Sequence, residues 1–189
     1  MSTQPQTFFT PEEYLELERK AEYKSEYCNG EIFAMSGASR RHNAIALTLY
    51  AMFVQRNRGR KCQGFTSDMR VLVDPPGLYT YPDLSATCGE PQFADASEDT
   101  LINPALVVEI VSPSTEAYDR GKKARMYRGM SSLQELLLIA QDRYDVELRR
   151  RQADGTWLLL DAVGLDASIE LTSVSCTLPL GELYENLTQ

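Results

Sequence analysis

The chain has 189 residues, of which 43% are hydrophobic and 24% are charged. This length and composition exclude disordered and fibrous classes, and they predict a single domain over residues 1–189. No apolar run approaches the roughly 20 residues that cross a bilayer, and the first residues lack a signal peptide's apolar core, so we expect a cytoplasmic protein without membrane contact. The net charge of −8 argues against non-specific nucleic-acid binding by the whole surface.

The first element predicted along the chain is a helix over about 11–21. Thr10 has the side chain of an N-cap, and Glu13 follows three residues later, which is the pattern of a capping box. A β-hairpin comes next, because Asn29-Gly30 stands between two alternating runs and favours a two-residue turn. We expect its strands near 24–28 and 31–36.

A long core helix is predicted between Ser39 as its cap and Gly59 as its stop. Ile45, Leu49 and Phe53 recur there at helical spacing. Beyond this helix the sequence predicts a strand over 61–73, a turn at 74–77, a strand over 79–87 that carries Asp83, and an acidic loop over 88–103.

A glutamate stands in the middle of the most apolar short run, the predicted strand over 105–111. Desolvating a carboxylate costs several kcal/mol unless a cation or a metal matches it. Glu109 therefore needs a partner, although a buried ion pair with an arginine would also satisfy it. The candidates are Asp83 and the lysines of a basic helix expected up to Arg128. Two carboxylates and an amine suit a divalent-metal site.

The remaining chain predicts three strands, near 135–140, 145–151 and 157–162, before a tail with a short strand and a helical turn. The order of elements favours an α/β fold in which helices flank a mixed β-sheet, preceded by an N-terminal helix and β-hairpin.

The metal-ligand inventory favours oxygen. The four cysteines are widely separated and form no CxxC or Cys/His cluster, so we expect free structural thiols rather than a zinc site. With His42 as the only histidine, a metal would be held by carboxylates, which indicates Mg²⁺ or Mn²⁺.

Basic residues are concentrated in two segments, 40–61 and 120–128, which contain no acidic residue. Such segments can face phosphates, and they are equally typical of solvated helix faces. His42 could act as a general base or phosphate ligand, although a histidine at a helix start more often bonds a backbone group.

Several segments resemble a known family. Pro82-Asp83 on one strand, followed by Glu109 on an apolar strand, resembles the PD-(D/E)XK nuclease superfamily and, more specifically, its Uma-type restriction endonuclease-like family. The resemblance covers nearly the whole chain, and EIVSPST from Glu109 followed by DRGKKARMY from Asp119 is its most specific part. It implies a restriction endonuclease-like fold and a Mg²⁺- or Mn²⁺-dependent endonuclease that hydrolyses DNA.

The resemblance also implies roles for single residues. Asp83 and Glu109 would be metal ligands and catalytic acids. The usual lysine two residues after the acid is replaced here by Val111, and Lys123 on the following helix takes the matching position, with Lys122 as its neighbour. Glu26 or Glu31 would supply a further catalytic acid. Taken without the resemblance, Asp83 is also typical of a strand end, Lys123 of a solvated helix face, and both hairpin glutamates of an exposed turn.

The candidate DNA-binding residues are Arg40, Arg41, His42, Arg120 and Lys122, and a homodimer would allow both strands to be cut. Two alternatives stay open. One is a catalytically silent nuclease-fold binding or regulatory module, which the pI of 4.8 and Val111 favour. The other is a hydrolase of a non-nucleic-acid substrate.

Overall fold

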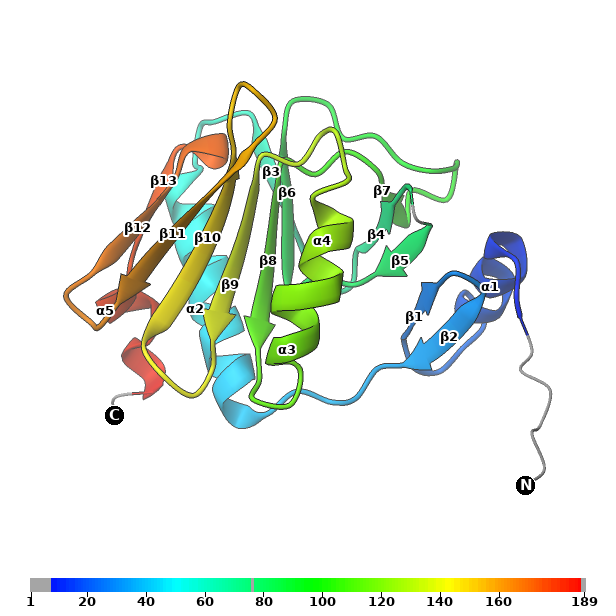
Figure 1. Ribbon diagram of the computed structural model, residues 1–189, viewed down its shortest axis with the longest axis horizontal. Helices are drawn as coiled ribbons and strands as arrows, with labels where there is room; N and C mark the ends of the chain where they lie inside the picture. The colour runs from blue at the N-terminus through cyan, green and yellow to red at the C-terminus, as the bar shows by residue number, and fades with distance from the viewer. Residues whose placement is uncertain (1–7, 76, 188–189) are drawn as a thin grey trace.

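The computed structural model describes residues 8–75 and 77–187 and has a mixed α/β architecture (Figure 1). Residues 1–7, part of the basis for the signal-peptide expectation, and Pro76 in the expected turn lie outside the described residues. The helical segments are α1 (Pro11–Glu18), α2 (Arg40–Arg56), α3 (Glu116–Tyr118), the π-helical turn η1 (Asp119–Lys123), α4 (Ala124–Tyr127), the 3₁₀ turns η2 (Thr172–Val174) and η3 (Glu185–Leu187), and α5 (Leu180–Leu183).

Three sheets are formed by the described strands. The six-stranded sheet has the order β11 (Trp157–Val163), β10 (Asp145–Arg151), β9 (Glu135–Ala140), β8 (Leu106–Val111), β6 (Leu84–Cys88), β3 (Cys62–Thr66). The five-stranded sheet has the order β2 (Glu31–Ala34), β1 (Ser25–Cys28), β5 (Leu78–Thr80), β4 (Arg70–Val73), β7 (Thr100–Leu101). The third sheet pairs β12 (Ser168–Leu171) with β13 (Cys176–Pro179). The strands β8 and β9 are parallel, and the α3–η1–α4 segment connects them.

Two local predictions at the N-terminal end are confirmed. The Thr10 hydroxyl accepts from the Glu13 N–H at 3.2 Å while the Glu13 carboxylate accepts from the Thr10 N–H at 2.8 Å, so the capping box is complete. Asn29 and Gly30 have φ values of 51° and 92°. Both values lie in the left-handed region that a type I′ hairpin turn requires.

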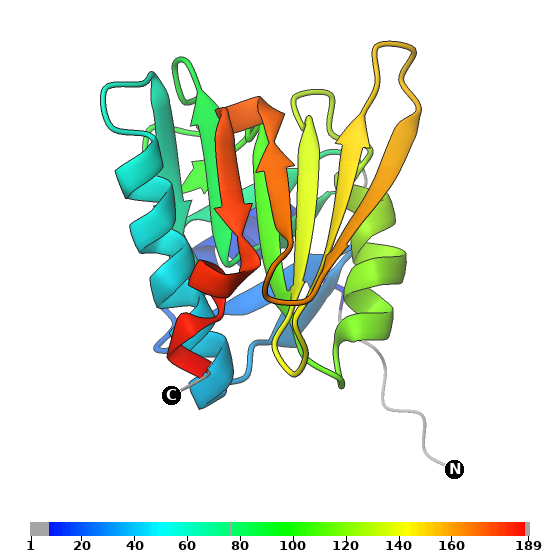
Figure 2. The same ribbon diagram turned by 90° about the vertical axis from the view of Figure 1, so that its left-hand side faces the viewer.

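The six-stranded sheet is covered on both faces, as Figure 2 shows, with α2 and the β12–β13 pair on one side and α3–α4 on the other. Strand β8 therefore carries apolar side chains on both of its faces. Val108 and Ile110 pack toward α2, whereas Val107 and Val111 pack toward α4 and the five-stranded sheet. Because side chains alternate along a strand, Glu109 shares the α4 face with Val107 and Val111.

The strands predicted over 61–73 and 79–87 are each two strands that belong to different sheets. A turn separates β3 from β4, with the Met69 N–H donating to the Thr66 carbonyl at 3.0 Å. Pro82 falls between β5 and β6, and it cannot donate to a ladder. The apolar alternation continues through both breaks, so periodicity alone did not reveal them. The expected acidic loop also contains the short strand β7.

The expectation of four free cysteines is wrong for two of them. Cys62 and Cys88 form a disulfide between β3 and β6, where the register places the two residues directly opposite each other. Their separation of 26 residues hides this pairing in the sequence. Cys28 and Cys176 are free, as predicted, and the structure shows that both are buried.

Candidate functional site

Glu109 lies on the face of β8 that α4 covers, and its side chain is only 8% exposed. The Lys123 ammonium is 2.9 Å from its Oε1 atom. The Tyr127 hydroxyl donates to the same oxygen at 2.6 Å. Lys123 and Tyr127 are four residues apart, which places them on one side of the helical segment. The buried carboxylate thus has the cation that its desolvation requires.

Asp83 lies beside Glu109 because the β6–β8 register pairs Leu84 with Val108, and one further step places Asp83 opposite Glu109. The Ile110 N–H donates to Asp83 Oδ2 at 2.6 Å. His42 Nε2 is 3.0 Å from Asp83 Oδ1. The first turn of α2 and the backbone of β8 together fix the orientation of this carboxylate.

Glu26 on β1 completes a bridge through Lys123. The ammonium is 2.8 Å from Glu26 Oε1, and the Thr80 hydroxyl donates to the same oxygen. The π-helical turn η1 supplies Lys123. Such turns are rare in proteins as a whole, but where they occur they are frequently at functional sites. Asp119 and Lys123, four residues apart in this turn, are both buried.

Burial and the surrounding acids set the protonation equilibria here. Burial raises the pKa of Glu109 to about 8; Lys123 lowers it, and Asp83 and Asp119 raise it further. Burial likewise raises the pKa of Asp119. For His42, burial alone would lower the pKa, but the hydrogen bond to Asp83 and the negative charges of Asp83 and Glu109 together outweigh burial, and the pKa is raised. Together with Glu26, Lys123 and Tyr127, these side chains form one cluster, which carries more carboxylates than cations. This excess of negative charge favours binding of an additional cation.

The donor set fits Mg²⁺ or Mn²⁺, although it is not a complete protein cage. Within residues 8–75 and 77–187, no group of three or more histidine, cysteine, aspartate or glutamate side chains is arranged to hold a metal ion. Mg²⁺ usually takes only one or two carboxylates and keeps several waters or substrate oxygens. Asp83 and Glu109 from neighbouring strands would supply these carboxylates, and Lys123 and Tyr127 both contact the Oε1 atom of Glu109.

The other predicted site residues lie outside this cluster. Glu31 is at the turn end of the hairpin, opposite Cys28. Arg41 donates to the Gln141 carbonyl at 2.7 Å. Arg40 and Lys122 are exposed. Lys122 and Lys123 are therefore clearly distinguished by the fold, since only Lys123 reaches the acids.

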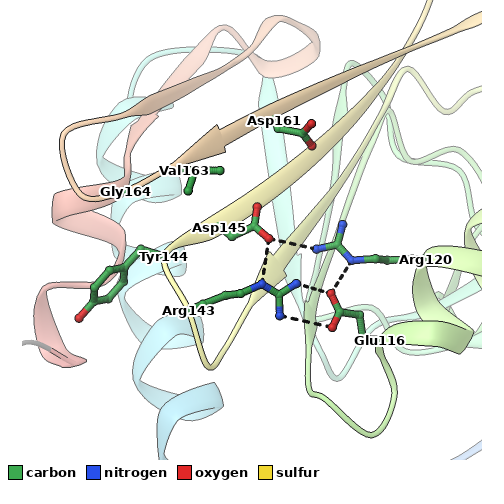
Figure 3. Close-up of a pocket in the computed structure, with 8 residues that line it drawn as sticks. All are labelled: Glu116, Arg120, Arg143, Tyr144, Asp145, Asp161, Val163 and Gly164. Atoms are coloured by element: carbon green, nitrogen blue, oxygen red, sulfur yellow. Dashed lines mark hydrogen bonds and ion pairs between the residues drawn. The ribbon is translucent and has the colours of Figure 1, made fainter.

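Arg120 points to a different place, a pocket of about 670 Å³ that does not include Glu109 or Lys123 (Figure 3). Its Nε is 2.7 Å from Glu116, and its Nη1 contacts Glu147. Arg143 also pairs with Glu116. The two pocket arginines are thus engaged by acids of the same chain rather than presented to a phosphate.

Tyr127 and Asp119 were not among the predicted site residues. A signal for both was available, because each lies four residues from Lys123 in the segment predicted to be helical. The uncharged tyrosine attracts no attention in a search for ligands and bases. Its contribution becomes evident only once the helix is placed over β8.

Replacing Tyr127 with phenylalanine should lower the free energy of unfolding by about 1–3 kcal/mol, because the variant removes a hydrogen bond to a buried carboxylate. Urea denaturation monitored by circular dichroism measures the change. Tyr184→Phe is the matched control, since that hydroxyl is equally buried but donates to the neutral Ala140 carbonyl at 2.8 Å. A smaller loss in Tyr127→Phe than in Tyr184→Phe would contradict a special role for the Glu109 contact.

Glu109 should also make stability depend on pH. Its pKa rises from the ordinary 4.5 to about 8 on folding, so the unfolded chain releases this proton first as pH rises. The contribution is fully present below about 4.5 and is lost as pH rises toward 8. In metal-free buffer, the stability difference between wild type and Glu109→Gln should shift against wild type across this window. A constant difference from pH 4.5 to 8 would contradict the raised pKa.

The fold is that of a restriction endonuclease-like protein. The solved structure of a putative nuclease belonging to DUF820, from Anabaena variabilis, superimposes with a TM-score of 0.75 at 22% sequence identity. The superposition covers 94% of this chain and 98% of that protein. That likeness establishes the fold.

The chain belongs to the Uma2 family, whose model matches residues 11–180 and is described as "Putative restriction endonuclease". Two uncharacterised proteins of Synechocystis sp. are similar over most of their length. The protein slr1290 is 36% identical over 94% of this chain and 92% of its own, and sll1609 is 37% identical over 86% and 92%. The predicted family and fold class are therefore confirmed.

In the part of the chain that the structure describes, every helix falls short of the length and apolarity needed to cross a bilayer.

Proposed function

We propose that the protein is a Mg²⁺- or Mn²⁺-dependent endonuclease that hydrolyses DNA phosphodiester bonds. The observation that carries this proposal is the buried Lys123 ammonium, which lies 2.9 Å from Glu109 and 2.8 Å from Glu26, with Asp83 on the neighbouring strand. Family membership supports the nuclease class. A cytoplasmic location, a homodimer and a single domain stay predictions.

Each residue has a role that its position supports. Asp83 and Glu109 would hold the ion, which when bound polarises the phosphate and acidifies the attacking water. The backbone N–H of Ile110 and the side chain of His42 keep Asp83 oriented. Lys123 would stabilise negative charge that develops on the phosphate oxygens. Glu26 would position the Lys123 ammonium, and Tyr127 would position the Glu109 carboxylate.

The test is cleavage of supercoiled plasmid and single-stranded DNA by purified protein in Mg²⁺, Mn²⁺ or EDTA. We expect metal-dependent nicking by wild type and its loss in Asp83→Asn and Glu109→Gln. Glu98→Gln, an exposed acid on the acidic loop, is the control that should retain activity. Nicking that persists equally in all three variants would show that another site, or a contaminant, cuts the DNA.

A catalytically silent binding module is the second candidate. It is favoured by the lack of a three-ligand metal group within the described residues and by the pI of 4.8. Calorimetric titration with Mn²⁺ separates the two candidates. An affinity that falls in Glu109→Gln supports the enzyme, whereas no Mn²⁺ binding by wild type supports the silent module.

A further inference from the structure

Two partly exposed aromatic rings lie near Glu26. The first is Phe33, the cross-strand partner of Glu26 in the β1–β2 hairpin. Residues directly opposite each other in an antiparallel pair project to the same face, with Cβ atoms about 5 Å apart. Phe33 is 49% exposed, and β2 is the edge strand of its sheet. Phe33 therefore lies next to Glu26 on the same face of the hairpin, at the open edge of the sheet, with its ring partly exposed.

The second ring is Tyr118, the last residue of α3. It is 39% exposed and precedes Lys123 by five residues, the spacing that a π-helical turn brings to one side. Burial raises the pKa of the Tyr118 hydroxyl to about 12, and the negative charge of Glu26 is the second cause of this rise. The hydroxyl therefore lies in the field of Glu26, on the same side of the helical segment as Lys123.

Charge complementarity between the protein surface as a whole and duplex DNA is weak. Duplex recognition depends on cationic contacts to many phosphates, yet the chain has a net charge of −8. Arg41 and Arg120 are engaged by the Gln141 carbonyl and by Glu116. Aromatic rings bind unpaired bases by stacking, an attraction that adds to phosphate contacts and does not itself depend on positive charge.

We propose that Phe33 and Tyr118 form a stacking platform for unpaired bases, so that the site takes single-stranded or locally unpaired DNA in preference to an intact duplex. This inference rests on the proposed nuclease function and adds its substrate class. A duplex keeps its bases stacked on each other, so their faces are not available to side chains. An unpaired strand can place one base on each ring while its phosphate approaches Lys123.

The test measures binding without turnover. Fluorescence anisotropy in EDTA at low salt compares a labelled single-stranded oligonucleotide with the blunt duplex of the same sequence. We expect tighter binding of the single strand, and about a tenfold loss of that affinity in Phe33→Ala and in Tyr118→Ala. Phe8→Ala is the matched control, because Phe8 is 65% exposed and packs on Gly30 at the turn of the same hairpin.

The outcomes separate this inference from the nuclease proposal. Equal affinity for the two forms of DNA, or unchanged affinity in both variants, overturns the platform even if wild type cuts plasmid. Selective single-strand binding that both variants weaken supports the platform even if no metal yields cleavage, and the nuclease proposal then fails alone. An equal loss in Phe8→Ala also overturns it, because the effect would then belong to the hairpin surface as a whole. Urea midpoints check that all three variants fold.

Discussion

Replacing Lys123 with methionine is expected to lower metal-dependent DNA cleavage by about 10²–10³-fold, the usual cost of removing one preorganised group that stabilises developing charge. Methionine reproduces the apolar stem of lysine and removes the ammonium that bridges Glu26 and Glu109. Single-turnover cleavage of an end-labelled oligonucleotide at saturating Mn²⁺ measures the rate without contributions from metal affinity.

Lys122→Met is the matched control, because Lys122 is the exposed neighbour of the same residue type. It should retain the cleavage rate to within a few-fold and leave stability nearly unchanged. Lys123→Met should also lower the free energy of unfolding by about 3–5 kcal/mol, because breaking a buried ion pair leaves an uncompensated acid. Equal loss of cleavage in the two variants would show that positive charge near the DNA, rather than the buried bridge, determines the rate.

The sequence predicted Glu109 and Lys123 as site residues through two separate signals. Glu109 is detectable because a charge interrupts an apolar strand, and the pleat of that strand places it on the face that the next helix covers. The resemblance suggested Lys123 over Lys122. The choice between them follows from the π-helical turn, which buries Lys123 and leaves its neighbour exposed. No periodicity in the sequence predicts a π-helical turn, so this part needed the structure.

Long-range pairing was the part that the sequence could not give. The contact of Glu26 with Lys123 joins residues 97 apart and depends on the hairpin packing against the α3–α4 segment. The Cys62–Cys88 disulfide depends on the register of two strands whose ends the sequence does not mark. In each case local propensity determines the element, whereas packing against a distant element determines the contact.

Glu135→Ala is expected to lower the free energy of unfolding by about 3–5 kcal/mol, because this fully buried carboxylate has an arginine partner and several donors that would lose their acceptor. Arg150 Nε is 2.7 Å from its Oε1 atom. The Thr172 N–H at 3.1 Å and the Ser173 N–H at 2.9 Å also donate to this carboxylate, together with both hydroxyls. Urea denaturation measures the loss. Glu170→Ala, an exposed glutamate on β12, should change stability by less than about 0.5 kcal/mol.

Glu135 and Glu109 are buried glutamates on adjacent strands, and their partners distinguish a structural role from the catalytic role proposed for Glu109. Both oxygens of Glu135 are used by donors of its own chain, which clamp η2 onto β9 and leave no need for an external cation. Glu109 instead shares one lysine with Glu26 and lies opposite Asp83, so its environment is short of positive charge. Folded Glu135→Ala should therefore cut DNA at nearly the wild-type rate per active molecule, whereas Glu109→Gln should fold and not cut. The reverse pattern would place the catalytic carboxylate on β9 rather than on β8, and it would contradict the proposed site.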